Sequence, residues 1–159
     1  GKNSFKGGFL GLDNIGVFDR SAELPTGGKL SQADGTAWMA FFSLQMMQIA
    51  IELAQHNRVY EKSAMKFFDH FLHIANAMTN MCGTGQGLWD EEDGFFYDML
   101  NLPDGRNIPL KLKSMVGLIP LYAVEVVDSD VLMKLPRLHR HMHWYMEENP
   151  ELAELVPSI

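Results

Sequence analysis

The chain has 159 residues, of which 47% are hydrophobic and 21% are charged, and its formal net charge is -7. Such a composition is typical of a globular protein and argues against a disordered one. Thirteen Lys and Arg residues stand against twenty Asp and Glu residues. This excess of acid argues against nucleic acid or an anionic membrane as a partner, because both attract clustered cations.

Residues 1–33 are predicted to form a loop. They contain seven of the fourteen glycines and show little helical period. The glycines are Gly1, Gly7, Gly8, Gly11, Gly16, Gly27 and Gly28. Glycine lets the backbone turn sharply and approach other groups closely. Because long loops inside compact domains are mostly functional, we look for a site here first.

Two helices are predicted next, over residues 34–56 and 60–81. In the first, large apolar residues recur at spacings of three and four, and the other sides are apolar as well. Such a helix is packed on several sides. Gln45, Gln48 and Glu52 interrupt it, so we do not predict a membrane span, which needs about 20 apolar residues. The second helix has one apolar and one polar face.

Residues 95–112 alternate between inward and outward side chains around the turn sequence Pro103-Asp104-Gly105-Arg106. This pattern predicts a β-hairpin. Ser114 is placed to cap a third, nearly all-apolar helix that reaches residue 127. A last amphipathic helix is predicted over residues 136–148, with Pro136 in its first turn.

Inner apolar helices therefore alternate with outer amphipathic ones. This order predicts an all-α fold, made of helical hairpins of the (α/α)6-barrel type in an incomplete ring, with one small β-hairpin insertion. The expected parts are a glycine-rich loop (1–33), a first helical hairpin (34–82), an acidic-aromatic loop with the β-hairpin (83–113) and a second helical hairpin (114–159).

Two stretches have residues suited to chemistry. Asp13 is flanked by Leu12 and Ile15, and partial desolvation there would raise its pKa and suit it to donate a proton. The alternative is that Asp13 or Asp19 caps a turn or pairs with Arg20. In residues 87–98, Trp89 stands beside four successive acids. Sugar sites combine aromatic rings and carboxylates in this way; the alternative is a solvated acidic turn.

The sequence lacks the motifs of several other kinds of enzyme. The sequence has no glycine-rich phosphate loop and no Gly-x-Ser-x-Gly motif. Cys82 is the single cysteine, which excludes an intrachain disulfide and favours a reducing, cytoplasmic compartment. His139 and His143 share a helix face and could hold a transition metal, although a simple histidine pair is the plainer interpretation. We therefore expect no cofactor and no metal.

Four segments together resemble a known family. They are the Gly11-Leu12-Asp13-Asn14 motif, the Gln32-Ala33-Asp34 entry to the first helix, residues 87–98, and the Ser-Met-Val-Gly-Leu-Ile-Pro-Leu run at residues 114–121. They resemble the catalytic α/α barrel of glycoside hydrolase family 63 and its mannosylglycerate-hydrolase-like bacterial relatives. The resemblance spans nearly the whole chain.

The resemblance implies an inverting hydrolase that acts on α-glucosidic or α-mannosidic bonds through two carboxylic acids. It assigns the general acid to Asp13. It places Asp34 and Trp89 at the sugar pocket, with Asp90 and Asp93 as further substrate contacts. In the family, the general base lies downstream of any stretch present here. We therefore expect a fragment of a longer enzyme that is inactive in isolation.

The alternative function is a non-catalytic helical module that binds carbohydrate or protein, or that only oligomerises. In an incomplete ring, the helices at 34–56 and 114–127 would expose apolar faces, which soluble monomers rarely tolerate over more than a few hundred Å². The sequence thus predicts that the chain forms a homodimer through these inner helices. The predicted small-molecule partner is a carbohydrate substrate.

Overall fold

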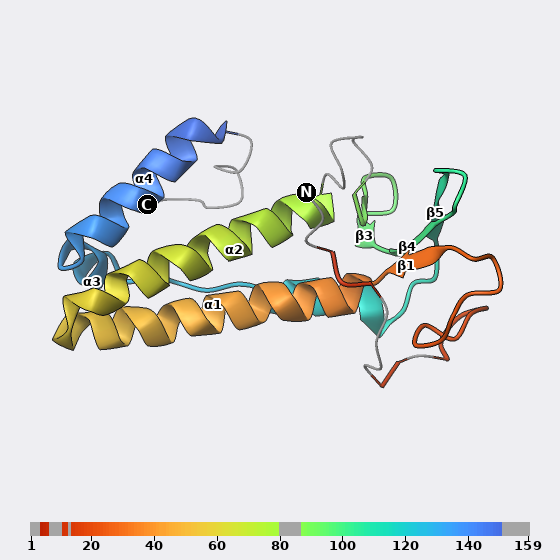
Figure 1. Ribbon diagram of the computed structural model, residues 1–159, viewed down its shortest axis with the longest axis horizontal. Coiled ribbons are helices and arrows are strands. Elements are labelled where there is room, and N and C mark those ends of the chain that lie inside the picture. The colour runs from red at the N-terminus through yellow and green to blue at the C-terminus, as the bar shows by residue number, and fades with distance from the viewer. Residues whose placement is uncertain (1–3, 7–10, 13, 80–86, 151–159) are drawn as a thin grey trace. The chain divides into compact units, whose positions relative to one another are not determined.

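The computed structural model describes residues 4–6, 11–12, 14–79 and 87–150 (Figure 1). Helices take up 54% of these residues and strands 12%, in two antiparallel sheets of three and two strands. The expected all-α class is therefore wrong, and the described residues do not form an α/α barrel. The chain divides into a first unit, Gly1–Ala40 with His73–Ala123, and a second unit, Phe41–Leu72 with Val124–Ile159.

The first unit contains a three-stranded antiparallel sheet in the order β1 (Lys29–Ser31), β4 (Asp98–Asn101) and β5 (Asn107–Leu110) (Figure 1). Leu30 lies opposite Leu100 in the register of β1 and β4. β1 falls in the segment expected to be a loop, and three residues are too short to show a strand period. Gly28, just before β1, lets the backbone come close to the end of β4, because a Cβ at this position would collide with the carbonyl oxygen of Asn101.

The hairpin of β4 and β5 closes at the turn sequence that predicted it. The Leu102 N–H donates to the Arg106 carbonyl at 2.8 Å, and the Asp104 carboxylate accepts from the Arg106 N–H at 3.0 Å. Gly105 has a φ of 88°, a left-handed conformation that favours glycine. A second, two-stranded sheet pairs β2 (Trp89–Asp90) with β3 (Phe95–Phe96).

The third helix is shorter than the sequence predicted and is of a different type. Met115–Tyr122 form a 3-10 helix, η3, and residues 123–128 are not helical. Ser114 caps it as expected, since its Oγ accepts from the Val116 N–H at 3.3 Å. Pro120 has no N–H to donate, so the run cannot continue as an α-helix through it. Gly117 lets η3 lie against β3, because a Cβ would meet the Phe95 ring and the Phe96 carbonyl.

Most of the side chains that the long helix α1 (Ala33–His56) buries are small. Its large residues Trp38, Phe42 and Ile49, expected on a packed face, are 37%, 56% and 54% exposed. Its buried apolar residues are Ala33, Ala37, Ala40, Leu44, Met47, Ala50, Ile51 and Ala54, and Asp34, Gly35, Thr36 and Ser43 are buried as well. By length and composition alone, α1 is also apolar enough to cross a membrane, with a mean hydropathy of 1.3. Core helices of globular proteins meet the same criterion, so this is weak evidence for a span.

The second unit contains the end of α1, the 3-10 turn η1 (Arg58–Tyr60), the start of α2 (Glu61–Thr79), α3 (Ser129–Met133) and α4 (Pro136–Glu148). The bounds of α4 are those that the sequence predicted. The Glu61 carboxylate of α2 accepts from the Arg137 and Leu138 N–H groups at 2.9 and 3.2 Å, which caps the start of α4. Between the same helices, the rings of Phe68 and Tyr145 meet edge to face, 6.0 Å apart.

Candidate functional site

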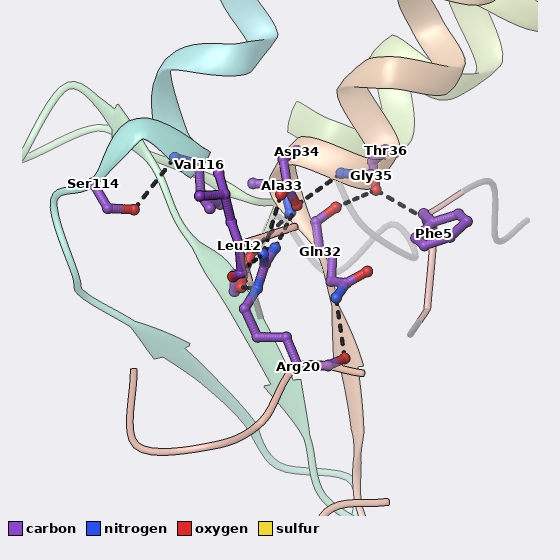
Figure 2. A network of polar contacts seen from close by, with 11 residues as sticks. Phe5, Leu12, Arg20, Gln32, Ala33, Asp34, Gly35, Thr36, Ser114 and Val116 are labelled. Atoms are coloured by element: carbon purple, nitrogen blue, oxygen red, sulfur yellow. Dashed lines mark hydrogen bonds and ion pairs between the residues drawn. The ribbon is translucent and has the colours of Figure 1, made fainter. Parts of the chain in front are cut away.

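A buried cluster of charged groups stands at the centre of the first unit. The Arg20 side chain is 3% exposed and lies between two carboxylates. Its Nε donates to Asp98 Oδ2 at 2.6 Å. Its Nη1 donates to Asp34 Oδ2 at 3.1 Å (Figure 2). Its Nη2 also contacts Asp34 Oδ1. Arg20 thus joins the glycine-rich segment to the start of α1 and to β4.

Arg20 is tied to the backbone at two further points. Its Nη1 donates to the Leu12 carbonyl at 3.0 Å, and its own carbonyl accepts from Gln32 Nε2 at 3.1 Å (Figure 2). A guanidinium group presents five N–H donors in a rigid plane, so it can hold two carboxylates and a carbonyl at once. The Arg20 side chain therefore fastens the segment before β1 at several points at once.

The start of α1 offsets the negative charge of the two carboxylates. The Ala33 N–H donates to Asp98 Oδ1 at 2.8 Å, and the Gly35 N–H donates to Asp34 Oδ1 at 2.8 Å. Amide groups at a helix N-terminus favour nearby anions. Burial raises the pKa of Asp98, although the Ala33 N–H and the Arg20 guanidinium both act to lower it.

A cleft of about 330 Å³ opens beside this cluster, within the first unit. Its walls come from the segment before β1, from β3 and β4, and from β5 with the start of η3. The lining residues are Ile15, Gly16, Val17, Phe18, Arg20, Phe96, Tyr97, Asp98, Pro109, Leu110, Lys111, Leu112, Ser114 and Val116. The lining is mostly apolar, with aromatic rings from two of the walls and a few polar groups, a composition common in small-molecule sites.

Two of the acids in residues 87–98, Asp90 and Asp93, form ion pairs with lysines that follow β5. Lys111 Nζ lies 2.7 Å from Asp90 Oδ2 and 3.0 Å from Asp93 Oδ2, and Lys113 Nζ lies 3.2 Å from Asp93 Oδ1. The hydrogen bond from Lys111 holds the pKa of Asp90 and of Asp93 below the usual range, with Lys113 adding to the effect at Asp93. The Tyr97 hydroxyl also donates to Asp93 at 3.1 Å.

None of the predicted site residues that the structure describes lines the cleft. Asp13 is outside the described residues. Asp34 is 1% exposed and bound to Arg20, so it does not reach a ligand in the cleft. The half-buried Trp89 ring packs on Phe96, with ring centroids 4.8 Å apart. Asp90 and Asp93 are paired with lysines. Asp34 and Trp89 therefore each contact a residue that lines the cleft, Arg20 and Phe96, without lining it themselves.

Sequence reasoning missed the roles of Arg20, Asp98 and Lys111. Arg20 was considered only as a partner for Asp13 or Asp19. Asp19 instead accepts from the Ser21 N–H at 2.9 Å. One signal was available, since Arg20 is the single arginine among the first 33 residues, in a segment rich in glycine. Its partner Asp98 lies 78 residues away, a separation that no local pattern reveals.

A comparison with known proteins finds a relative of this chain. No family model matches the chain, and no solved structure matches it significantly. The chain is similar to the uncharacterized protein YMR196W of Saccharomyces cerevisiae, with 48% identity over 165 aligned residues. The alignment covers 97% of this chain and 15% of the yeast protein. The chain thus spans a small part of the length of that relative.

Proposed function

We propose that this chain is part of a glycoside hydrolase acting on α-glucosidic or α-mannosidic bonds, and that its cleft binds a sugar unit of the substrate. One observation supports this most directly. The segment that follows Asp13 and the strand segment 96–98 both line the same cleft. Residues 96–98 belong to one of the stretches on which the family resemblance rests, and a second one, the run at residues 114–121, adds Ser114 and Val116 to the same cleft. The segment after Asp13 directly follows a third, the motif at residues 11–14.

The cleft suits a sugar in size and chemistry. About 330 Å³ is at the lower end of the roughly 300–1,000 Å³ found for small-molecule sites, which fits one or two sugar rings. Phe18 and Phe96 offer ring faces for the apolar side of a pyranose. Lys111 and Ser114 offer donors to its hydroxyl groups.

The proposed roles follow from these positions. Asp13 is the general acid, by family resemblance. Asp34 and Asp98 hold Arg20 and with it the segment from residue 15 to residue 18, so they position the cleft wall rather than contact substrate. Trp89 packs against the ring of Phe96, which lines the cleft, and helps to position it. The general base comes from another part of a longer polypeptide, in line with a relative that extends far beyond the aligned part.

Sugar binding is tested by saturation-transfer NMR on the purified chain with glucose, mannose and their α-linked disaccharides. We expect saturation transfer to at least one sugar, and a weaker effect in Phe18→Ala, which removes a ring from the cleft. Tyr122→Ala is the matched control, because it removes an exposed ring that does not line the cleft. Absence of transfer to every sugar would reject the binding proposal for this chain.

A non-catalytic sugar-binding module is the second candidate. Asp98 is the one carboxylate among the described lining residues, and it is bound to Arg20 and to the Ala33 N–H. Because this carboxylate is already paired, the described lining offers no free acid or base, which favours a binding module. The two candidate functions predict different activities for a longer polypeptide that contains this segment. An enzyme would hydrolyse α-glucosides or α-mannosides and lose that activity in Asp13→Asn, whereas a binding module would bind sugars without turnover.

A further inference from the structure

Two histidines converge on the surface of α4, in the second unit. His139 Nε2 and His143 Nε2 are 3.1 Å apart, and the ring centroids are 4.5 Å apart with an interplanar angle of 77°. His143 is exposed and His139 half-buried. Residues four apart lie on the same face of a helix, one turn from each other. Here the same nitrogen of each ring points at the other.

We propose that His139 and His143 together bind a divalent transition-metal ion such as Zn²⁺, Ni²⁺ or Cu²⁺. Imidazole nitrogens suit these ions. Nitrogens that ligate one ion at roughly 2.0–2.1 Å lie about 2.9 Å apart at a right angle and about 3.4 Å apart in a tetrahedron. The separation of 3.1 Å lies between these values. The pair is thus already spaced to chelate, and it needs little rearrangement to bind.

The contrast with His141 supports this assignment. His141 lies between the two in sequence, but its ring turns towards α2, where its Nε2 is 2.7 Å from Asp69 Oδ1. His141 thus has a structural partner, whereas the two Nε2 atoms of His139 and His143 face each other at the surface. With neutral rings, that contact is a single hydrogen bond with one donor and one acceptor. To bind a metal ion through both nitrogens, the donor ring takes its other neutral tautomer, with the proton on Nδ1, so that both Nε2 lone pairs face the ion.

The site is an open one. Among the described residues, no group of three or more His, Cys, Asp or Glu side chains is placed to hold an ion. The two histidines therefore supply two ligands, and water or an exchangeable donor fills the other positions, as in sites that keep open coordination. By the usual order of affinities, Cu²⁺ binds more tightly than Ni²⁺ or Zn²⁺.

Calorimetric titration of the untagged chain with NiCl2 and with ZnCl2 at neutral pH tests the proposal. We expect one ion per chain, and an affinity that falls about tenfold or more, or about 1.4 kcal/mol, in both His139→Ala and His143→Ala. His56→Ala is the control, because His56 is an exposed histidine on another helix and its loss leaves the pair intact. Circular dichroism checks that each variant is folded.

A second readout locates the ion. Paramagnetic Cu²⁺ should broaden the amide resonances of α4 around residues 139–143 before any others. The proposal is overturned if the wild-type chain binds neither ion, if both alanine variants bind as tightly as the wild type, or if broadening is centred on another part of the chain.

Discussion

Arg20 Nε and Asp98 Oδ2 lie 2.6 Å apart, joining two residues that are 78 positions apart in the sequence. This contact and the one to Asp34 fasten the segment before β1 to the sheet and to α1. Both acids are nearly fully buried, so the pairing is not weakened by solvent as it would be at the surface. The wall of the cleft is therefore held by charge as well as by apolar contacts, since Leu12 and Ile15 of this segment pack against a buried apolar cluster.

Removing the charge of Arg20 should destabilise the protein strongly. Arg20→Ala leaves two buried carboxylates without their cation, and breaking a buried pair in this way costs about 3–5 kcal/mol of unfolding free energy. Urea denaturation followed by circular dichroism measures the loss. Arg20→Lys should recover only part of it, because a lysine cannot bind two carboxylates in the plane of a guanidinium.

A matched arginine serves as the control for that experiment. Arg106 pairs with Asp104 at the surface, 2.8 Å apart, and its side chain is 71% exposed. Exposed pairs contribute little, because water and salt screen them. Arg106→Ala should leave the urea midpoint almost unchanged. If Arg20→Ala were as mild as Arg106→Ala, the cluster would not hold the segment.

Glu61 should make the stability depend on pH in the acid range. Burial acts to raise the pKa of Glu61, but hydrogen bonds from the Leu138 N–H, Arg58 and the Arg137 N–H together lower it below 4.5. Because the folded-state pKa is the lower one, the contribution is complete above the unfolded-state pKa and is lost as pH falls through the folded-state value. Glu61→Gln should therefore cost about 1–3 kcal/mol at neutral pH.

Urea midpoints across a pH series check this prediction. The difference between the wild type and Glu61→Gln should begin to narrow as pH falls below the unfolded-state pKa of about 4.3, and it should be lost as pH falls through the lower folded-state pKa. Glu52→Gln is the control, because Glu52 is exposed on α1. A difference that stays constant with pH would show that the charge of Glu61 does not cap α4.

The sequence predicted elements whose signals are local. α4 was predicted with its observed bounds because Pro136 marks its first turn and its apolar residues follow the helical period. The hairpin turn at residues 103–106 has a similar local signature. β1 was missed because its pairing with β4 is non-local, and its three residues show no period. In η3, the apolar pattern suggested an α-helix, but Pro120 prevents the hydrogen bonding that an α-helix needs.

The candidate site was harder to predict than the elements. The sequence singled out the aromatic residues of 87–98 as a group with possible chemistry, and in the structure Phe96 rather than Trp89 lines the cleft. Asp34 was assigned to substrate, but its carboxylate is bound to Arg20. Whether an acid meets a ligand or a buried cation depends on tertiary contacts, which a spacing pattern does not contain.

Gly117→Ala should disturb the contact between η3 and β3. The added Cβ would collide with the Phe95 ring and with the Phe96 carbonyl oxygen, and backbone atoms cannot move aside as a flexible side chain can. Overpacking of this kind costs about 1–3 kcal/mol. Gly16→Ala is the control, since no atom lies within 4 Å of a Cβ built there. Equal thermal midpoints for both variants would contradict the close packing.

The proposed homodimer predicts self-association through the apolar surface of η3. Leu118, Leu121 and Tyr122 are 48%, 67% and 55% exposed, and the Tyr122 ring stacks on Trp38 at 6.2 Å. Covering apolar area stabilises an assembly by about 25 cal/mol per Å². Light scattering should give a mass above 18.0 kDa at high concentration, reduced in Leu121→Glu. A concentration-independent mass of one chain would contradict the dimer.

Finally, we expect that this chain alone does not hydrolyse aryl α-glucosides or α-mannosides. An inverting mechanism needs two carboxyl groups about 6.5–9.5 Å apart, one to donate a proton and one to activate water. Around the cleft, Asp98 is bound to Arg20, and Asp90 and Asp93 are bound to Lys111. Ion-paired carboxylates whose pKa is lowered, as for Asp90 and Asp93, are weak bases and poor proton donors.

Release of nitrophenol from aryl glycosides, followed over a long incubation, measures this activity directly. The same assay on a longer polypeptide that contains this segment should show turnover that Asp13→Asn abolishes, because the asparagine side chain cannot donate a proton as an acid. Asp104→Asn is the matched control, since Asp104 lies at the exposed turn between β4 and β5. Turnover by the present chain, lost in Asp13→Asn, would mean that the second carboxylate lies within these residues. In that case the proposed division of acid and base between this segment and another part of the polypeptide would be wrong.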